Sequence, residues 1–325
     1  MVAEGQAGQA GHPGHRNRKV LGFAACTAAS SLWGCGFFFG KIALAEMNVG
    51  HMVLYRFLFA ALALLPLLFT HPPRFNRREW WVLLVASFLG VPVQFLLQFY
   101  GLSLTTVSHA SLMVGTMPVI LAVGAAVFAH ERMDRVGWVA LAASTIGAGM
   151  IALGGGGHTG AGGASLEGDL LVVVSLGIAL GWILLNKQLM EGHSPVAVTA
   201  FGTVLGTAML LVWVPVRYGA PPVPFLSGHV SIKAWLALIA SGVLCTATTT
   251  LLWNWGLTQV PASQAGILLN MEPLMGSLLG VFVLGEQLGP SAWAGGGLIL
   301  LSAVTLTTGS KTRVKAPAGE QLPIT

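Results

Sequence analysis

Two stretches of the sequence decide the fold: GTMPVILAVGAAVFAHE at residues 115–131 and NMEPLMGSLLGVFVLGE at residues 270–286. In each, a proline interrupts an apolar run and a glutamate ends it, and the two prolines are Pro118 and Pro273. Only the second stretch has a carboxylate inside the run, at Glu272. The chain therefore contains one helical segment twice, with one chemical difference between the copies.

The match extends beyond these stretches, because residues 100–153 align without gaps onto residues 255–308. The aligned pairs include Pro118 with Pro273, Glu131 with Glu286, and Trp138 with Trp293. The first half of the unit is fainter, with Lys41 matching Lys187. We therefore predict a repeated unit of five helices. An odd number of helices places the second copy upside down in the membrane, which makes an inverted-topology repeat.

The composition is that of an integral membrane protein. Of the 325 residues, 54% are hydrophobic and only 8% are charged, whereas a soluble domain has about 25% charged residues. A helix needs about 20 mainly apolar residues to cross the bilayer. The sequence supplies ten such runs and so predicts an all-α polytopic membrane protein with ten transmembrane helices. They lie near residues 20–44, 51–70, 80–101, 107–129, 136–154, 169–188, 195–216, 233–256, 262–284 and 291–309.

The repeat also predicts the domain organisation. Residues 1–19 read as a disordered cytoplasmic tail, and residues 20–154 as the first five-helix repeat. A Gly-rich linker over residues 155–168 leads to the second repeat at residues 169–309. Residues 310–325 form a second cytoplasmic tail.

The basic residues predict the orientation, because short cytoplasmic loops carry an excess of Lys and Arg. With the N-terminus inside, only Arg217 and Lys233 fall in outer loops, while Lys41 and Arg56 lie near helix ends on that side. N-in and C-in is therefore the predicted topology. The inner side receives Arg16, Arg18, Lys19, Arg74, Arg77, Arg78, Arg132, Arg135, Lys187, Lys311, Arg313 and Lys315.

Several motifs resemble those of the EamA-type transporters of the drug/metabolite transporter superfamily. They are SLWG at residues 31–34, Lys41, YRF at residues 55–57, and the two blocks in which Pro, Glu and Trp recur. The resemblance covers residues 20–309. It implies a ten-helix carrier of the bacterial inner membrane that moves small organic metabolites and often exports amino acids. It also implies a central cavity lined by helices 1, 3, 4, 6, 8 and 9, and it does not fix the substrate.

Glu272 is the sharpest candidate for a functional residue. It lies in the middle of a predicted span, where a charge costs at least a few kcal/mol unless it faces a cavity, is paired or is protonated. Pro273 bends the helix beside it, as Pro118 does in the first copy, and frees a backbone carbonyl. We interpret Glu272 as a proton-coupling carboxylate or an anchor for a substrate amine. The alternative is a protonated Glu that only joins helices.

Further polar residues lie within the predicted spans. Gln94 and Gln98 share one helix face at a spacing of four residues, which turns that face away from lipid. Either they bind substrate or they join helices. Asn270 lies two residues before Glu272. Four aromatic residues are candidates for the cavity walls, although Tyr100 is equally suited to the interfacial aromatic belt. They are Trp33, Tyr100, Trp182 and Trp253.

Other residues are candidates for gating or structure. Lys41 and Arg56, near outer helix ends, either snorkel to the interface or act at the outer gate. His109 is a candidate titrating gate, although a lone His near a membrane surface is more often structural. Glu131 and Glu286 are expected to satisfy backbone donors at the start of the following helix.

Other classes of function lack their expected signals. A membrane enzyme needs a nucleophile with its base, or metal ligands at suitable spacing, and a channel needs charged rings or a filter loop. We find no such pattern, no ATP-binding motif and no basic patch for nucleic acid, and we expect no catalytic residue, cofactor or metal. The residues leave a drug or sugar carrier of the same fold, or a polytopic membrane enzyme, as alternatives.

The sequence therefore predicts a secondary transporter that exports a small organic metabolite across the lipid bilayer. The prediction is that it works by alternating access, in which the two repeats rock against each other. Protons are a candidate coupling ion. The substrate, the direction of transport and the choice between monomer and homodimer stay open at this point.

Overall fold

The computed structural model describes residues 13–70, 72, 74–117, 119–120, 124, 135–154, 164–223, 225–226, 228–257, 259, 268–269 and 271–309. Every regular element in these ranges is a helix, which confirms the all-α prediction. The predicted spans near 107–129 and 262–284 fall partly outside the described residues. The count of ten helices and their inverted arrangement therefore stay predictions.

The elements are helices of different lengths, and two long helices are each interrupted by a π-helical segment. They are α1 (Pro13–Leu44), α2 (Val49–Thr70), α3 (Arg77–Phe88), η1 (Leu89–Val93), α4 (Gln94–Leu104), α5 (Val107–Val114), α7 (Arg135–Gly154), α8 (Leu166–Met190), α9 (Pro195–Tyr218), α10 (Ile232–Gly242), η2 (Val243–Thr248), α11 (Thr249–Leu257), α13 (Met271–Phe282) and α14 (Pro290–Gly309). Within the described ranges, six helices are long and apolar enough to cross a membrane. Shorter apolar helices cover Trp138–Gly147 and Met271–Phe282. The chain is therefore a multi-pass membrane protein.

Side-chain caps begin several of these helices. Asn76 caps α3 in a capping box, because its Oδ1 accepts from the Glu79 amide at 2.9 Å and Glu79 Oε2 accepts from the Asn76 amide at 2.7 Å. Such caps satisfy amides that have no partner within the helix. Hydroxyl caps begin three more helices: Thr106 for α5, Ser165 for α8 and Ser231 for α10.

The N-terminal boundary differs from the prediction. We expected a disordered tail through residue 19, whereas α1 already begins at Pro13. Proline suits the first turn of a helix, where its missing N–H has no partner to lose. The apolar pattern that predicts a membrane span therefore marks only the part of α1 that is suited to lipid, Arg18–Leu44.

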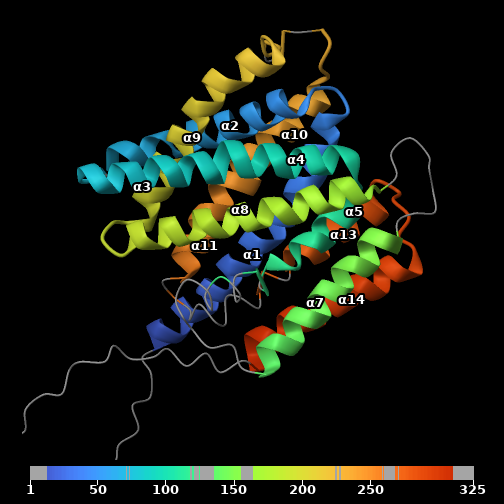
Figure 1. The fold of residues 1–325 in the computed structure, drawn as a ribbon. Helices are drawn as coiled ribbons and strands as arrows, with labels where there is room; N and C mark the ends of the chain where they lie inside the picture. The colour runs from blue at the N-terminus through green and yellow to red at the C-terminus, as the bar shows by residue number, and fades with distance from the viewer. Residues whose placement is uncertain are drawn as a thin grey trace, which may run out of the picture.

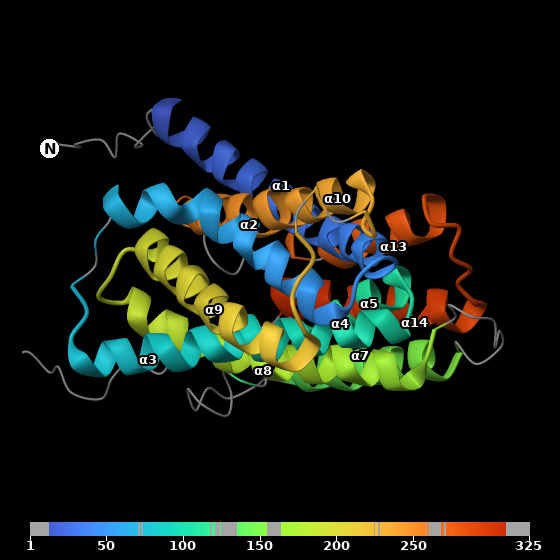
Figure 2. The same ribbon diagram turned by 90° about the horizontal axis from the view of Figure 1, so that it is seen from above.

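The helix α1 is central to the packing and contacts α2, α10, α11 and α13 (Figures 1 and 2). The helices α7 and α14 pack side by side at one edge of the bundle (Figure 1). Glycine permits this closeness, since a Cβ atom at Gly147 would lie 2.7 Å from the carbonyl oxygen of Gly295. The largest fully buried side chains of the core are Trp235, Phe99, Met52, Leu54, Leu64, Leu83, Leu102, Met113, Leu210, Leu238 and Ile299.

The two π-helical segments occupy matched positions of the internal repeat. The register that pairs Tyr100 with Trp255 also pairs the ends of η1, Leu89 and Val93, with Leu244 and Thr248 of η2. Pro92 lies within η1, where it removes a backbone donor, whereas η2 has no proline. Single π-helical turns inside α-helices occur frequently at functional sites. The repeat thus extends to a backbone irregularity that the sequence alignment does not show.

Candidate functional site

Arg56 projects from α2 into the interior and binds η2. Its Nε donates to Thr246 Oγ1 at 3.0 Å, and its Nη2 donates to the Cys245 carbonyl at 3.4 Å. A π-helical turn disrupts the regular hydrogen-bond ladder and so leaves a carbonyl available to an outside donor. Only 4% of the Arg56 surface is exposed. Arg56 therefore does not snorkel to the interface, which excludes one of the two interpretations of this residue.

Aromatic rings and a glycine complete the surroundings of Arg56. The guanidinium carbon lies 5.2 Å from the Phe95 ring centre and 5.0 Å from the Phe99 ring centre. Such cation–π contacts stabilise a cation that has left water. A Cβ atom at Gly36 of α1 would lie 3.3 Å from Arg56 Nη2. The absence of a side chain at Gly36 therefore makes room for the guanidinium beside α1.

Glu272 lies in the first turn of α13, on another side of α1. It is partly buried, and its side chain interacts electrostatically with Arg56. Gly34 of α1 lies against the Glu272 carbonyl and the Gly276 amide, so α1 and α13 approach closely here. Arg56 and Glu272, both of which the structure describes, form no direct ion pair. A buried cation and a partly buried carboxylate thus both lie beside α1, on different faces of it, and make no direct contact with each other.

Two predicted aromatic residues meet near this region. Trp33 of α1 and Trp253 of α11 pack with ring centres 5.4 Å apart and an interplanar angle of 54°. Trp182 of α8 lies against Gly90 of η1, where any larger side chain would collide with the indole. Each π-helical segment therefore contacts one predicted site residue from another helix: η1 contacts Trp182, and η2 contacts Arg56. Tyr100 is 47% exposed, an exposure that suits the belt interpretation.

The amide pair on α4 is buried, as the sequence predicts for a face turned away from lipid. Gln94 and Gln98 are 7% and 6% exposed. Gln94 Oε1 has no hydrogen-bond partner in the described part of the chain. A buried acceptor without a partner costs roughly 1–3 kcal/mol, so this oxygen is available to a donor from a ligand.

A second polar cluster lies where α4, α5 and α8 meet. His109 Nδ1 of α5 and Asp169 Oδ2 of α8 are 2.9 Å apart, and both side chains are buried. Thr105 Oγ1 donates to the other carboxylate oxygen at 2.6 Å. Lys41 Nζ donates to the carbonyls of Leu102, at 2.8 Å, and of Thr105. Asp169 does not stand out in the sequence, because an acidic residue in the first turn of a helix is ordinary there.

Glu286 caps a different helix from the one we predicted. Its carboxylate accepts from the amides of Val107, at 2.7 Å, and Ser108, at 2.8 Å, and from Ser108 Oγ at 2.7 Å. It thus caps α5 of the first repeat, whereas we expected it to cap the following helix, α14. The chain leaves α13 through Gly285, whose φ of 70° favours glycine. This turn carries Glu286 back to the start of α5.

Three further predicted residues lie outside the described residues: Pro118, Asn270 and Glu131. The described residues that the structure brings together come from both repeats. Arg56 of the first repeat and Glu272 of the second repeat both lie beside α1. His109 of α5, in the first repeat, pairs with Asp169 of the second repeat, and Glu286 of the second repeat caps α5. A polar interior built from two copies of one unit is the arrangement expected of a carrier with its site at the repeat interface.

Comparisons with known proteins identify the family of the chain. The model of the EamA-like transporter family matches twice, over residues 20–153 and 166–308. An uncharacterized transporter of Archaeoglobus fulgidus is 25% identical over 280 residues, which cover 85% of this chain and 93% of the relative. The uncharacterized transporter YetK of Bacillus subtilis is 25% identical over 268 residues, which cover 81% and 80% of the two chains.

A solved crystal structure has the same fold, with a TM-score of 0.62 at 17% sequence identity, over 90% of this chain and 96% of the other. That likeness concerns the fold alone. The two family matches together cover most of the chain. The chain belongs to the EamA-like transporter family and is a multi-pass membrane transporter.

Proposed function

We propose that this transporter is a secondary carrier that exports an amino acid or a related zwitterion across the bacterial inner membrane by alternating access. The observation that carries the proposal is the placement of Arg56 and Glu272 around α1. Arg56 is a permanent cation that suits a substrate carboxylate, and Glu272 suits a substrate amine. Because the two side chains make no direct ion pair, each is available to one end of a zwitterion.

The neighbouring groups support this assignment. Gln94 Oε1 is a buried acceptor without a partner in the described chain and would accept a further N–H from the substrate. Trp33 and Trp253 would form an apolar wall. An uncharged sugar would leave the buried Arg56 cation unmatched, which argues against a sugar carrier.

Alternating access rests on the two repeats. In the proposed topology ten helices form two inverted five-helix units with both termini inside, and the domain boundaries are those predicted from the sequence. The contacts of α5 with Asp169 and with Glu286 join the repeats at one end of the bundle. In the proposed cycle these contacts close the outer side and separate when the carrier opens outward.

The test is counterflow into proteoliposomes with three matched substrates: an amino acid, the amine that lacks its carboxylate and the acid that lacks its amine. We expect the zwitterion to exchange fastest. Arg56→Gln should abolish the advantage of the zwitterion over the amine, and Glu272→Gln its advantage over the acid. Arg217→Gln, on the exposed end of α9, is the matched charge control.

The same assay at two pH values tests proton coupling. If Glu272 releases its proton in each cycle, exchange should depend on pH in the wild type and not in Glu272→Gln. Exchange of none of the three substrates, together with hydrolysis of a lipid or peptide, would instead support the alternative of a polytopic membrane enzyme. Uniform exchange of all three would remove the zwitterion assignment and leave the carrier.

A further inference from the structure

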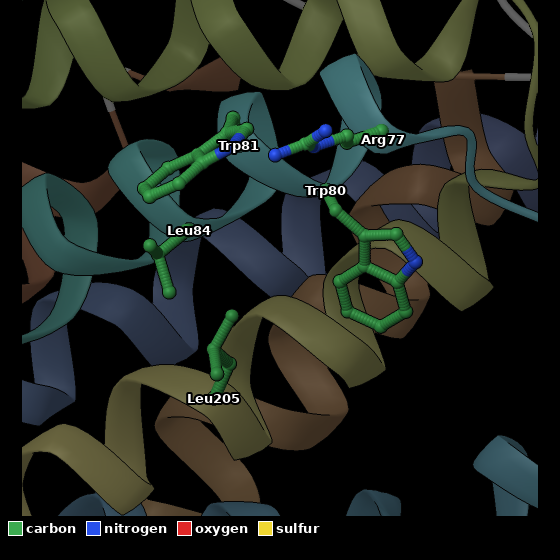
Figure 3. A pocket seen from close by; sticks show the side chains of 5 residues that line it. All are labelled: Arg77, Trp80, Trp81, Leu84 and Leu205. Carbon is green, nitrogen blue, oxygen red and sulfur yellow. The ribbon is translucent and has the colours of Figure 1, made fainter.

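A groove away from the proposed substrate site opens between α3 and α9. It has a volume of about 490 Å³ and is lined by Arg77, Trp80, Trp81, Leu84 and Leu205 (Figure 3). Figure 3 shows these side chains arranged around an open centre, with Arg77 and Trp81 beside each other. The volume is within the range of roughly 300–1,000 Å³ found for small-molecule sites. The groove therefore has room for part of a ligand.

The lining changes from polar to apolar along α3. Arg77 is the first residue of the helix and of its membrane-spanning segment. Leu84 lies seven residues further along, which is about 10 Å at the rise of an α-helix. The groove therefore extends from the membrane–water interface into the hydrocarbon. A ligand that fits it has a polar head at Arg77 and an apolar chain beside Leu84 and Leu205.

The aromatic wall of the groove is held in place. Trp80 packs edge-on against Phe75, with ring centres 5.2 Å apart, and against Phe201, with ring centres 6.4 Å apart. These contacts leave 44% of Trp80 exposed. Trp81 is 61% exposed. Tryptophans at this depth commonly contact lipid, and here one of them is fixed as the side of a groove.

The charge at the head of the groove is positive. Arg74, Arg77 and Arg78 are all exposed around the start of α3. The nearby carboxylate of Glu79 is engaged by the Asn76 amide and by His193 Nε2, at 3.1 Å. Within the described part of the chain, no acidic side chain forms an ion pair with Arg77. The guanidinium is therefore available to an anion from the membrane surface.

We propose that the groove between α3 and α9 binds an anionic phospholipid, with its phosphate at Arg77 and one acyl chain along Leu84 and Leu205. Basic pockets between membrane helices recognise lipid head groups through the phosphate charge. A free phosphate would gain nothing from the apolar part of the groove, which covers most of its lining. The occupant is thus a lipid of the leaflet in which α3 begins.

The experiment is native mass spectrometry of the delipidated full-length protein with added phosphatidylglycerol or phosphatidylcholine of the same acyl chains. We expect one phosphatidylglycerol to bind more tightly than phosphatidylcholine. Arg77→Gln should weaken phosphatidylglycerol binding about fivefold. The matched control is Arg78→Gln, since Arg78 is adjacent and exposed but does not line this groove. Arg78→Gln should leave that binding unchanged.

A second variant tests the apolar part of the site. Leu205→Trp fills the groove and should weaken binding of phosphatidylglycerol without removing any charge. Equal binding of the two lipids by the wild type would overturn the proposal. Equal losses of phosphatidylglycerol binding in Arg77→Gln and Arg78→Gln would also overturn it, because they would mean that the basic surface attracts the lipid without a specific site. A lipid-independent dimer that Leu205→Trp dissociates would show that a second copy covers the groove instead. The lipid-binding test does not use counterflow, so a negative result in it would not affect the proposed substrate.

Discussion

His109 and Asp169 form a buried pair between the two repeats, with His109 Nδ1 2.9 Å from Asp169 Oδ2. The pair joins α5 to α8, and Thr105 adds a hydrogen bond from the start of α5 to the same carboxylate. Removing one partner from a buried pair leaves the other without compensation, which is costly inside a protein. This pair is therefore well suited to hold one end of the bundle closed.

The first prediction is that Asp169→Ala destabilises the protein strongly. The change leaves the buried His109 ring nitrogen and the buried Thr105 hydroxyl without their partner, and each such group costs roughly 1–3 kcal/mol. The measurement is thermal unfolding of the purified protein in detergent. The control is Glu167→Ala, because Glu167 lies in the same helical turn but is exposed. Equal melting temperatures for the two variants would show that the pair contributes little.

The second prediction concerns the cap that Glu286 makes on α5. Glu286→Ala removes the acceptor of two backbone amides and a negative charge at a helix N-terminus. Such a cap stabilises by about 1–2 kcal/mol. Hydrogen exchange of the Val107 and Ser108 amides should accelerate in the variant. Glu191→Ala, at an exposed helix end, should leave these amides unchanged. Unaltered protection in Glu286→Ala would mean that water replaces the cap at no cost.

The third prediction is a pH dependence at Glu46, in the connection after α1. Its carboxylate accepts from Ser231 Oγ and from the Ser231 amide, both at 2.6 Å. These hydrogen bonds hold the pKa of Glu46 below its ordinary value of 4.5, and the bond from the Ser231 hydroxyl has the larger effect. A lowered carboxyl pKa means that the stabilisation is present above the unfolded pKa and is lost as the pH falls through the folded pKa.

Glu46→Gln should therefore lower the melting temperature slightly at pH 7, and the difference should shrink as the pH falls below 4.5 and vanish once the pH lies below the folded pKa. The effect is small because Glu46 is exposed and water screens it. Thermal unfolding at several pH values measures it, with Ser231→Ala as the variant that removes the partner hydroxyl. A difference that persists unchanged at low pH would show that the interaction does not depend on the carboxylate charge.

The sequence predicts the class of fold well, because its strongest signal is composition. Apolar runs and the repeated Pro and Glu positions are local features, and the structure and the family matches agree with an all-helical membrane transporter with two copies of one unit. Glu272 stands out for the same reason, since a carboxylate within an apolar run is conspicuous in the sequence itself, and its role in transport stays a prediction.

Residues whose role depends on a distant partner were not predictable in this way. Asp169 looks like an ordinary acidic residue at a helix start until α5 packs against it. Glu286 looks like a cap for the next helix until the turn at Gly285 directs it to α5. Arg56 looks like an interfacial arginine because its binding partner, η2, is not recognisable in the sequence. The segment has no proline, and the hydrophobic pattern does not mark it.

The fourth prediction separates the charge of Arg56 from its position. Arg56→Gln removes the cation, and the loss of a hydrogen bond to a charged group should weaken binding of a zwitterion about 10- to 100-fold. Thr246→Val keeps the cation but removes the oxygen that accepts from Arg56 Nε. Thr246→Val should therefore raise the half-saturating substrate concentration less than Arg56→Gln does, and it should leave the preference for the zwitterion in place. Thr250→Val is the control, because the Thr250 hydroxyl bonds only to the Thr246 carbonyl among the described residues.

The measurement is counterflow at several substrate concentrations for the three variants. Thr246→Val removes only a group that positions Arg56, so the Arg56 charge should still reach the substrate carboxylate. If Thr246→Val abolished the preference for the zwitterion as completely as Arg56→Gln does, the π-helical segment would itself contact the substrate. If Thr250→Val had the same effect as Thr246→Val, the cause would be the integrity of η2. Only the graded series, with Arg56→Gln most affected and Thr250→Val unaffected, agrees with an arginine that binds the substrate and is positioned by η2.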